Sequence, residues 1–185
     1  DLKWPSRKIP LRCTPERIFY HSESKSHVLA VSLPFLANFV DLQPPIPIGP
    51  AGELRPGPPL PPVPPLPIAA EKGELRLVSA ATWQTVDRVS LDDFEQVSCV
   101  QQLGLSFQSV MHGPSSTRQF IVVGTSMSVN ESLAGRGRIL LIEMAPGNKM
   151  TVVIDREYKG PVTAVSSLDG SLVAAVGSRV IVLQL

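Results

Sequence analysis

Two histidines and a glutamate lie close together near the start of the chain, where they could bind a metal ion. His21, Glu23 and His27 are residue types that ligate zinc. A turn is expected between the two histidines, so one strand face cannot be assumed to hold both. Zinc sites also show two spaced pairs of ligands, and no second pair is evident here. The spacing therefore favours structural histidines, and we expect no bound metal.

No nucleophile, acid and base are spaced as an active site requires. Cys13 and Cys99 are the only cysteines, and neither belongs to a Cys-x-x-Cys motif. The segment 135–138, Gly-Arg-Gly-Arg, lacks the lysine and the further glycine of a phosphate-binding loop. It predicts instead a tight approach to a strand. We therefore expect a protein without enzymatic activity and without a cofactor.

Basic residues form two local clusters that could contact RNA or a partner protein. The predicted contacts are Arg7, Lys8 and Arg12 near the N-terminus, and Arg136 and Arg138 beside a loop. A formal net charge of +1 argues against binding nucleic acid by bulk electrostatics. An aromatic content of 5% also leaves few platforms for stacking single-stranded RNA. A solvated, charged connector is the simpler interpretation of the first cluster.

The elements that must position these residues are strands, because an apolar strand pair recurs three times. Strands that are apolar at every position must be buried on both faces, which for antiparallel hairpins requires sheets stacked on sheets. Internal copies of such a unit are typical of a propeller or a solenoid. The three copies are 28–32 with 73–79, 120–126 with 137–143, and 172–178 with 179–185.

Neighbouring strands complete each copy to a four-stranded unit, which predicts the blades of a β-propeller. Further strands are expected at 17–21, 97–105, 150–154 and 162–168, the last entering a tight hairpin through Asp169-Gly170. The count gives about two and three-quarter blades, too few to close a ring. We therefore predict an all-β chain, with a connector at 1–15 and part of a β-propeller at 16–185, that is a fragment of something larger.

One stretch is open to two interpretations. Behind Asp92 and Asp93, apolar residues recur at every third position, as in a short helix. The alternative is a turn at 91–94 followed by the opening strand of the second blade at 97–100. We favour the strand, because the unit otherwise loses its first member.

A proline-rich insertion, predicted at 34–72, separates the two strands of the first copy. Twelve of the nineteen prolines lie between 44 and 67. Such a tract lacks the backbone donors of a sheet interior and favours polyproline II. The segment 55–61 fits an SH3-domain ligand and 58–61 a WW-domain ligand, so a domain of either type is a possible partner. This loop, the one at 126–136 and the turn at 177–178 occupy the same slot in their units, which predicts that all three emerge on one face.

Several segments resemble the family of the large subunit of the cleavage and polyadenylation specificity factor. The likeness runs in order along nearly the whole chain, apart from the insertion and the segment around His112. It is carried by Trp4-Pro5, Arg7 to Thr14, Tyr20-His21, Val97-Ser98-Cys99, Gly124-Thr125, Arg136 to Leu140, Lys159 to Ala164, and Leu172 to Leu185. The family also includes a damaged-DNA-binding ubiquitin-ligase adaptor and a splicing factor 3b subunit. The segments 7–14, 136–138 and 159–164 resemble the polyadenylation branch most.

The resemblance implies a protein of several propellers, of which this chain is the start of the C-terminal one. It implies a nuclear scaffold in pre-mRNA 3′-end processing, which assembles the subunits that recognise the polyadenylation signal and meets pre-mRNA through them, with no membrane partner. The alternatives are a direct RNA-binding module or an adaptor of the related DNA-repair or splicing branches. The insertion at 43–70 departs from the family, so no contact of that loop is carried over.

Overall fold

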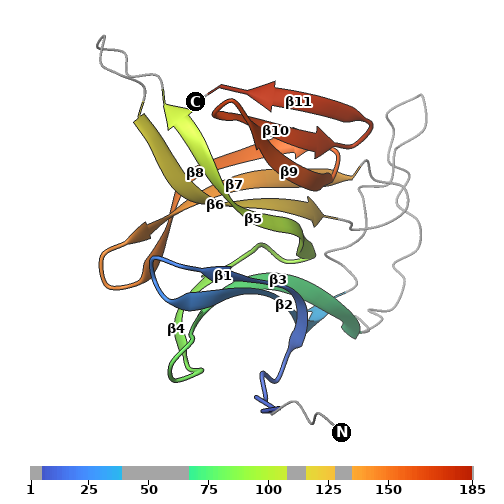
Figure 1. The fold of residues 1–185 in the computed structure, drawn as a ribbon. Helices are drawn as coiled ribbons and strands as arrows, with labels where there is room; N and C mark the ends of the chain where they lie inside the picture. The colour runs from blue at the N-terminus through green and yellow to red at the C-terminus, as the bar shows by residue number, and fades with distance from the viewer. Residues whose placement is uncertain (1–5, 39–66, 108–115, 128–134, 185) are drawn as a thin grey trace, which may run out of the picture.

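The computed structural model of the protein describes residues 6–38, 67–107, 116–127 and 135–184, which form three stacked antiparallel sheets (Figure 1). The first contains β1 (Thr14–His21), β2 (Ser26–Asn38), β3 (Pro67–Ser79) and β4 (Thr85–Ser90). The second contains β5 (Glu95–Phe107), β6 (Ser116–Met127), β7 (Arg136–Ala145) and β8 (Lys149–Lys159). The third contains β9 (Val162–Leu168), β10 (Ser171–Val176) and β11 (Arg179–Leu183). The predicted all-β fold, a partial propeller of two four-stranded blades and three strands of a third, is confirmed.

The described residues contain no helix, and hence none long and apolar enough to span a membrane. The hydrophobic core lies instead in two layers between the sheets. On β6, Ile121 and Val123 pack towards the first sheet, whereas Phe120 and Val122 pack towards the third. All four side chains are at most 2% exposed. The apolar runs thus have the double burial that their composition requires, which contributes about 1.5–3 kcal/mol for each such side chain.

The three predicted strand pairs are all present. Val28 lies opposite Leu77, Val123 opposite Leu140, and Ala174 opposite Ile181. The hairpin between β9 and β10 turns through Asp169 and Gly170, whose φ angles of 47° and 78° match the predicted tight turn.

The ambiguous stretch at 91–103 is a turn followed by β5, as favoured from the sequence. Phe94 has a φ of 63°, which a right-handed helix cannot include, and Glu95 opens the strand. Val97 and Leu103 then face opposite neighbouring sheets, so the threefold spacing of apolar residues comes from a strand with a register shift after Val97.

The hairpin of β2 and β3 is longer than the sequence suggests. Its pairing continues to Asn38 opposite Pro67, so both ends of the range predicted for the insertion are strand. Pro34 is tolerated inside β2 because β1 pairs only as far as Ser32, which leaves one side of β2 without a partner strand at that point. Residues 39–66, which hold most of the proline tract, and the loop at 128–134 lie outside the described residues. The segments predicted as SH3-domain and WW-domain ligands, 55–61 and 58–61, therefore lie outside them too.

The described strand ends that lead into these loops lie together. Ala70 and Glu71 of β3 share a small pocket with Phe94 and with Ser126 of β6. In Figure 1 these ends, and the turn between β10 and β11, lie on the right of the stack. The shared face predicted for the three connections therefore agrees with the described strand ends.

A candidate interaction surface around Arg138

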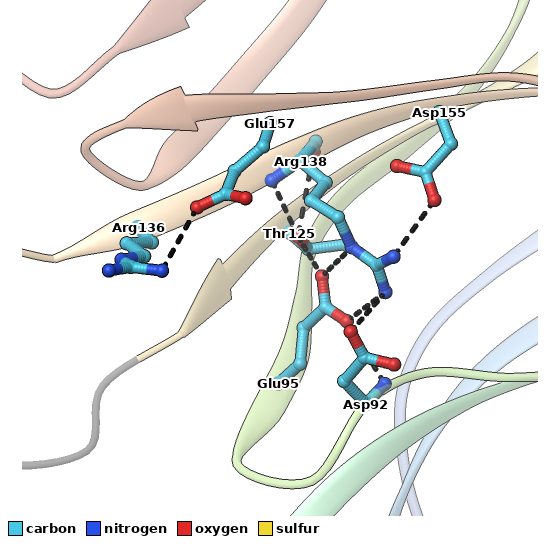
Figure 2. A network of polar contacts seen from close by, with 7 residues as sticks. All are labelled: Asp92, Glu95, Thr125, Arg136, Arg138, Asp155 and Glu157. Atoms are coloured by element: carbon cyan, nitrogen blue, oxygen red, sulfur yellow. Dashed lines mark hydrogen bonds and ion pairs between the residues drawn. The ribbon is translucent and has the colours of Figure 1, made fainter.

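Arg138 is the centre of a polar network that joins all four strands of the second sheet and the turn that leads into them (Figure 2). Its Nε donates to Glu95 Oε1 at 2.9 Å, and its Nη2 donates to the other carboxylate oxygen of Glu95. The same Nη2 lies 3.3 Å from an oxygen of Asp92, in the turn between the blades. Nη1 donates to Asp155 of β8 at 2.9 Å. The guanidinium therefore has acceptors on three sides.

Glu95 is fully buried, and each of its oxygens is paired. Thr125 Oγ1 donates to Oε1 at 2.5 Å, and the backbone N–H of Asp92 donates to Oε2 at 3.1 Å. Thr125 Oγ1 in turn accepts the backbone N–H of Arg138 at 2.9 Å. With both Arg138 bonds, four donors satisfy this carboxylate. A buried carboxylate needs such hydrogen bonds to offset the free energy lost when its charge is removed from water.

The local sequence explains how these side chains come together. Phe94, in the left-handed region, reverses the chain so that Glu95 enters β5 pointing at β6 and β7. Gly137 precedes the arginine and has no room for a side chain, because an added Cβ would lie 2.9 Å from Gly160 O and from Val162 N. The tight approach predicted for 135–138 is thus present, and it seats β7 against the start of the third blade.

The network keeps both partners charged. Burial raises the pKa of Glu95, but hydrogen bonds from Arg138, Thr125 and the backbone of Asp92 outweigh it, so this pKa lies below its ordinary value. The hydrogen bond to Glu95 raises the pKa of Arg138, and burial opposes the change only in part. The pair is therefore ionised at neutral pH.

This arrangement is poorly suited to bind a phosphate. The carboxylates of Asp92, Glu95, Asp155 and Glu157 surround the two guanidinium groups of Arg136 and Arg138, so the network has a formal charge of −2. Arg136 is well exposed, but it pairs with Glu157 at 3.3 Å. The cavity beside the network holds only about 160 Å³. Its chemistry is that of a structural lock, with room for no more than a small group.

The two predicted basic clusters do not form one surface. Arg7, Lys8 and Arg12 are exposed on the segment that leads into β1, at the end of the stack opposite β9–β11 (Figure 1). Arg136 and Arg138 begin β7 in the second sheet. RNA bound to both clusters would have to pass around the first blade.

The histidines near the N-terminus have separate structural contacts. His21 is buried, and its Nδ1 lies 2.9 Å from Ser24 Oγ and accepts the backbone N–H of the same serine at 3.2 Å. The ring of His27 stacks on Trp83 with centroids 5.1 Å apart. Within the part of the chain that is described, no group of three or more His, Cys, Asp or Glu side chains is placed to hold a metal ion.

Sequence reasoning missed a second buried ion pair. Arg76 Nε donates to Glu74 Oε1 at 2.6 Å on the outer face of β3, and both side chains are at most 10% exposed. Arg76 Nη1 also donates to the carbonyl of Leu11 at 3.1 Å and to Cys13 Sγ at 3.3 Å. The signal was present, since two opposite charges at alternate positions interrupt an apolar run.

Known proteins match the chain along its length. A family model described as the CPSF A subunit region matches residues 72–185. The chain belongs to this family. Among curated relatives, "Cleavage and polyadenylation specificity factor subunit 1" of Drosophila melanogaster is 27% identical over 100% of this chain and 13% of its own length. The protein of the same name in Arabidopsis thaliana is 28% identical over 98% of the chain and 13% of its own length.

"Protein cft1" of Schizosaccharomyces pombe is 29% identical over 98% of the chain and 12% of its own length. The chain thus spans about an eighth of the length of these relatives. The family resemblance stated from the sequence is confirmed, including on the residues that precede the range of the family model.

Proposed function

We propose that this chain is part of a non-enzymatic scaffold subunit in pre-mRNA 3′-end cleavage and polyadenylation, working in the nucleus. The observation that carries the proposal is its membership of the CPSF A subunit family, together with relatives named as subunit 1 of the cleavage and polyadenylation specificity factor. Those names describe the relatives, and we extend their role to this chain because of its similarity to them.

The geometry supports a scaffold over a catalyst. The most polar cluster, around Arg138, uses its charged groups on one another, with four donors on Glu95. Each charged side chain of this network has an ion-pair partner within it. A stack of sheets with buried ion pairs at Glu95 and at Glu74 suits a protein that presents surfaces to other subunits.

Its partners would be the other subunits of the cleavage and polyadenylation complex, including those that recognise the polyadenylation signal, and pre-mRNA would be reached through them. The acidic balance around Arg136 and Arg138 favours this indirect route over direct RNA contact at that site. A domain of the SH3 or WW type on the proline tract belongs to the same proposal, and deleting the tract tests it separately.

Affinity purification of the tagged full-length protein from nuclear extract tests the proposal. We expect subunits of the cleavage and polyadenylation machinery to be recovered in near-equal amounts, with recovery unchanged by ribonuclease. Recovery of ubiquitin-ligase or splicing subunits instead would place the protein in a related branch. Loss of all partners on ribonuclease treatment would favour the RNA-binding alternative.

A further inference from the structure

The second sheet is forked at one end, because β6 and β7 pair over only part of their length. Their pairing stops at Ile121 opposite Ile142. Beyond that point β6 continues to Ser116 alongside β5, and β7 continues to Ala145 alongside β8. The two strand ends therefore diverge while each keeps its other neighbour, and a gap opens between β6 and β7.

This gap forms a pocket of about 450 Å³, within the range of sites that hold a ligand. Ile121 and Ile142 are at most 1% exposed and form its floor. Its walls come from the diverging ends of β6 and β7, and the turn after β1 adds His21 and Glu23. The described lining thus belongs to the first and second sheets, which are neighbours in the stack, and the gap does not lie on the outer face of the first or the third sheet.

The strand edges along the gap present main-chain groups without a partner strand. The backbone N–H of Arg138 faces β6, because it donates to Thr125 Oγ1 at 2.9 Å. Main-chain groups of alternate residues in a strand point to the same side, so the N–H and C=O of Met144 face the gap. The extra residue at the nearby register shift belongs to β8, so this alternation along β7 is unbroken.

The same alternation applies to β6. Ile121 lies opposite Ile142, so the main-chain groups of Gln119 also face the gap. Among the described strands, none pairs with these two edges beyond Ile121 and Ile142. Unpaired edges of this kind are a template for pairing with another chain.

His21 adds a hydrogen-bond donor to the lining. Its side chain is 3% exposed, and its Nδ1 accepts the backbone N–H of Ser24 at 3.2 Å. In the neutral ring the proton is therefore on Nε2. No group in the described part of the chain accepts a hydrogen bond from Nε2. Buried donors are normally paired, so a ligand that carries an acceptor would complete this histidine.

The charges around the gap favour a polypeptide over nucleic acid. Arg118 Nη1 of β6 lies 3.5 Å from Glu143 Oε1 of β7, so these two charges offset each other. With Glu23, the described lining has one positive and two negative charges, a formal charge of −1. This balance repels a phosphate backbone. A polypeptide main chain instead brings the alternating donors and acceptors that a strand edge requires.

We propose that the gap binds an extended segment of a partner protein, which adds to the free edge of β7 through main-chain hydrogen bonds at Met144. On its other side the segment meets the edge of β6 at Gln119. Residues 143–145 are all of β7 beyond Ile142, so the paired part of the segment is short. The inference deepens the proposed scaffold function and rests on it.

Peptides selected on the full-length protein from a displayed random library are the probe that tests the proposal. Hydrogen exchange of single backbone amides is then measured with and without a selected peptide. We expect the peptide to slow exchange of the Met144 amide at least about tenfold. The Leu140 amide, on the same side of β7 but already opposite Val123 of β6, should exchange equally slowly in both states.

Two variants locate the binding. Gln119→Pro removes an N–H that faces the gap, and proline is tolerated where that N–H has no partner strand. Thr117→Trp fills the gap from β6, whereas Val153→Trp, at a residue 44% exposed on the last strand of the same sheet, is its matched control. We expect the first two to weaken the peptide about tenfold or more and the control to bind like the wild type. Circular dichroism checks that each variant folds.

The proposal is overturned if no selected peptide slows exchange at Met144, or if the folded Gln119→Pro and Thr117→Trp variants bind the peptide like the wild type. Slow exchange of the Met144 amide in the protein alone would overturn it as well, since the chain itself would then occupy the edge. Displacement of the peptide by oligouridylate would assign the gap to RNA instead.

These failures leave the scaffold function standing if the affinity purification still recovers the complex. Failure of that purification with intact peptide binding would remove the proposed function and leave the gap as a peptide site.

Discussion

Replacing Arg138 by alanine should destabilise the protein far more than replacing its neighbour Arg136. Arg138→Ala leaves the fully buried carboxylate of Glu95 with only the Thr125 hydroxyl and one backbone N–H as donors. Removing one partner of a buried ion pair costs about 3–5 kcal/mol. The Arg138 side chain is 20% exposed, so water replaces part of what is lost. We therefore expect a loss near the lower end, about 3 kcal/mol in the free energy of unfolding.

Arg136→Ala is the matched control on the same strand. Its ion pair with Glu157 joins side chains that are 66% and 59% exposed, so the loss should stay within about 0.5 kcal/mol. Urea unfolding at neutral pH, followed by circular dichroism, measures both. Equal losses of unfolding free energy in the two variants would contradict the structural role of the Arg138–Glu95 ion pair.

The pH dependence separates a charge effect from lost packing. In the wild type the pKa of Glu95 lies below its value of about 4.3 in an unfolded chain. The ionised carboxylate therefore stabilises the folded state above about pH 4.3, and this contribution is lost as the pH falls through the pKa of the folded state. Without Arg138, burial should raise the pKa of Glu95, and the variant should recover stability on acidification. The difference between wild type and Arg138→Ala should therefore shrink below about pH 4. A difference independent of pH would mean that packing alone was lost.

Three further perturbations test the stacking of the sheets. Gly137→Ala should lower the free energy of unfolding by more than about 2 kcal/mol, because the added Cβ would lie 2.9 Å from backbone atoms. Gly147→Ala, in open space at a φ of 82°, should lower it by about 1 kcal/mol. Thermal unfolding compares the two variants, and a larger loss for Gly147→Ala would contradict the close packing of β7 at Gly137. Ile142→Ala, at a fully buried core position, should cost about 2–5 kcal/mol in urea unfolding, and a loss below about 1 kcal/mol would contradict the packing of the first two sheets. Deleting 39–66 and joining the flanking strands by Asn-Gly should keep the β-sheet spectrum, with Tm changed by only a few degrees; loss of cooperative unfolding would show that the tract is part of the fold.

Much of the fold follows from the sequence because its strands are apolar at consecutive positions. Runs such as 120–123 have only one stable environment, between two sheets, so stacking could be predicted without knowing any contact. Turn positions followed from residues that accept positive φ, as at Gly170. The extent of the β2–β3 hairpin did not follow, because tolerance of Pro34 depends on where the neighbouring strand β1 ends.

The role of Arg138 was harder to anticipate. Its partners Glu95 and Asp155 lie far from it in sequence, and only the strand register brings them together. A lone arginine beside a loop is equally consistent with a phosphate contact and with an internal ion pair. The buried glutamate at the entry to β5 decides between them, and burial of a charged residue at a strand start leaves no mark in the sequence pattern.

We propose that the protein is a scaffold that holds the cleavage and polyadenylation machinery together. Sedimentation of nuclear extract after depletion of the protein tests this claim most directly, with the remaining subunits followed by mass spectrometry. We predict that those subunits sediment apart after depletion and return to one peak when the full-length protein is added back. Subunits that sediment together without the protein would contradict the claim.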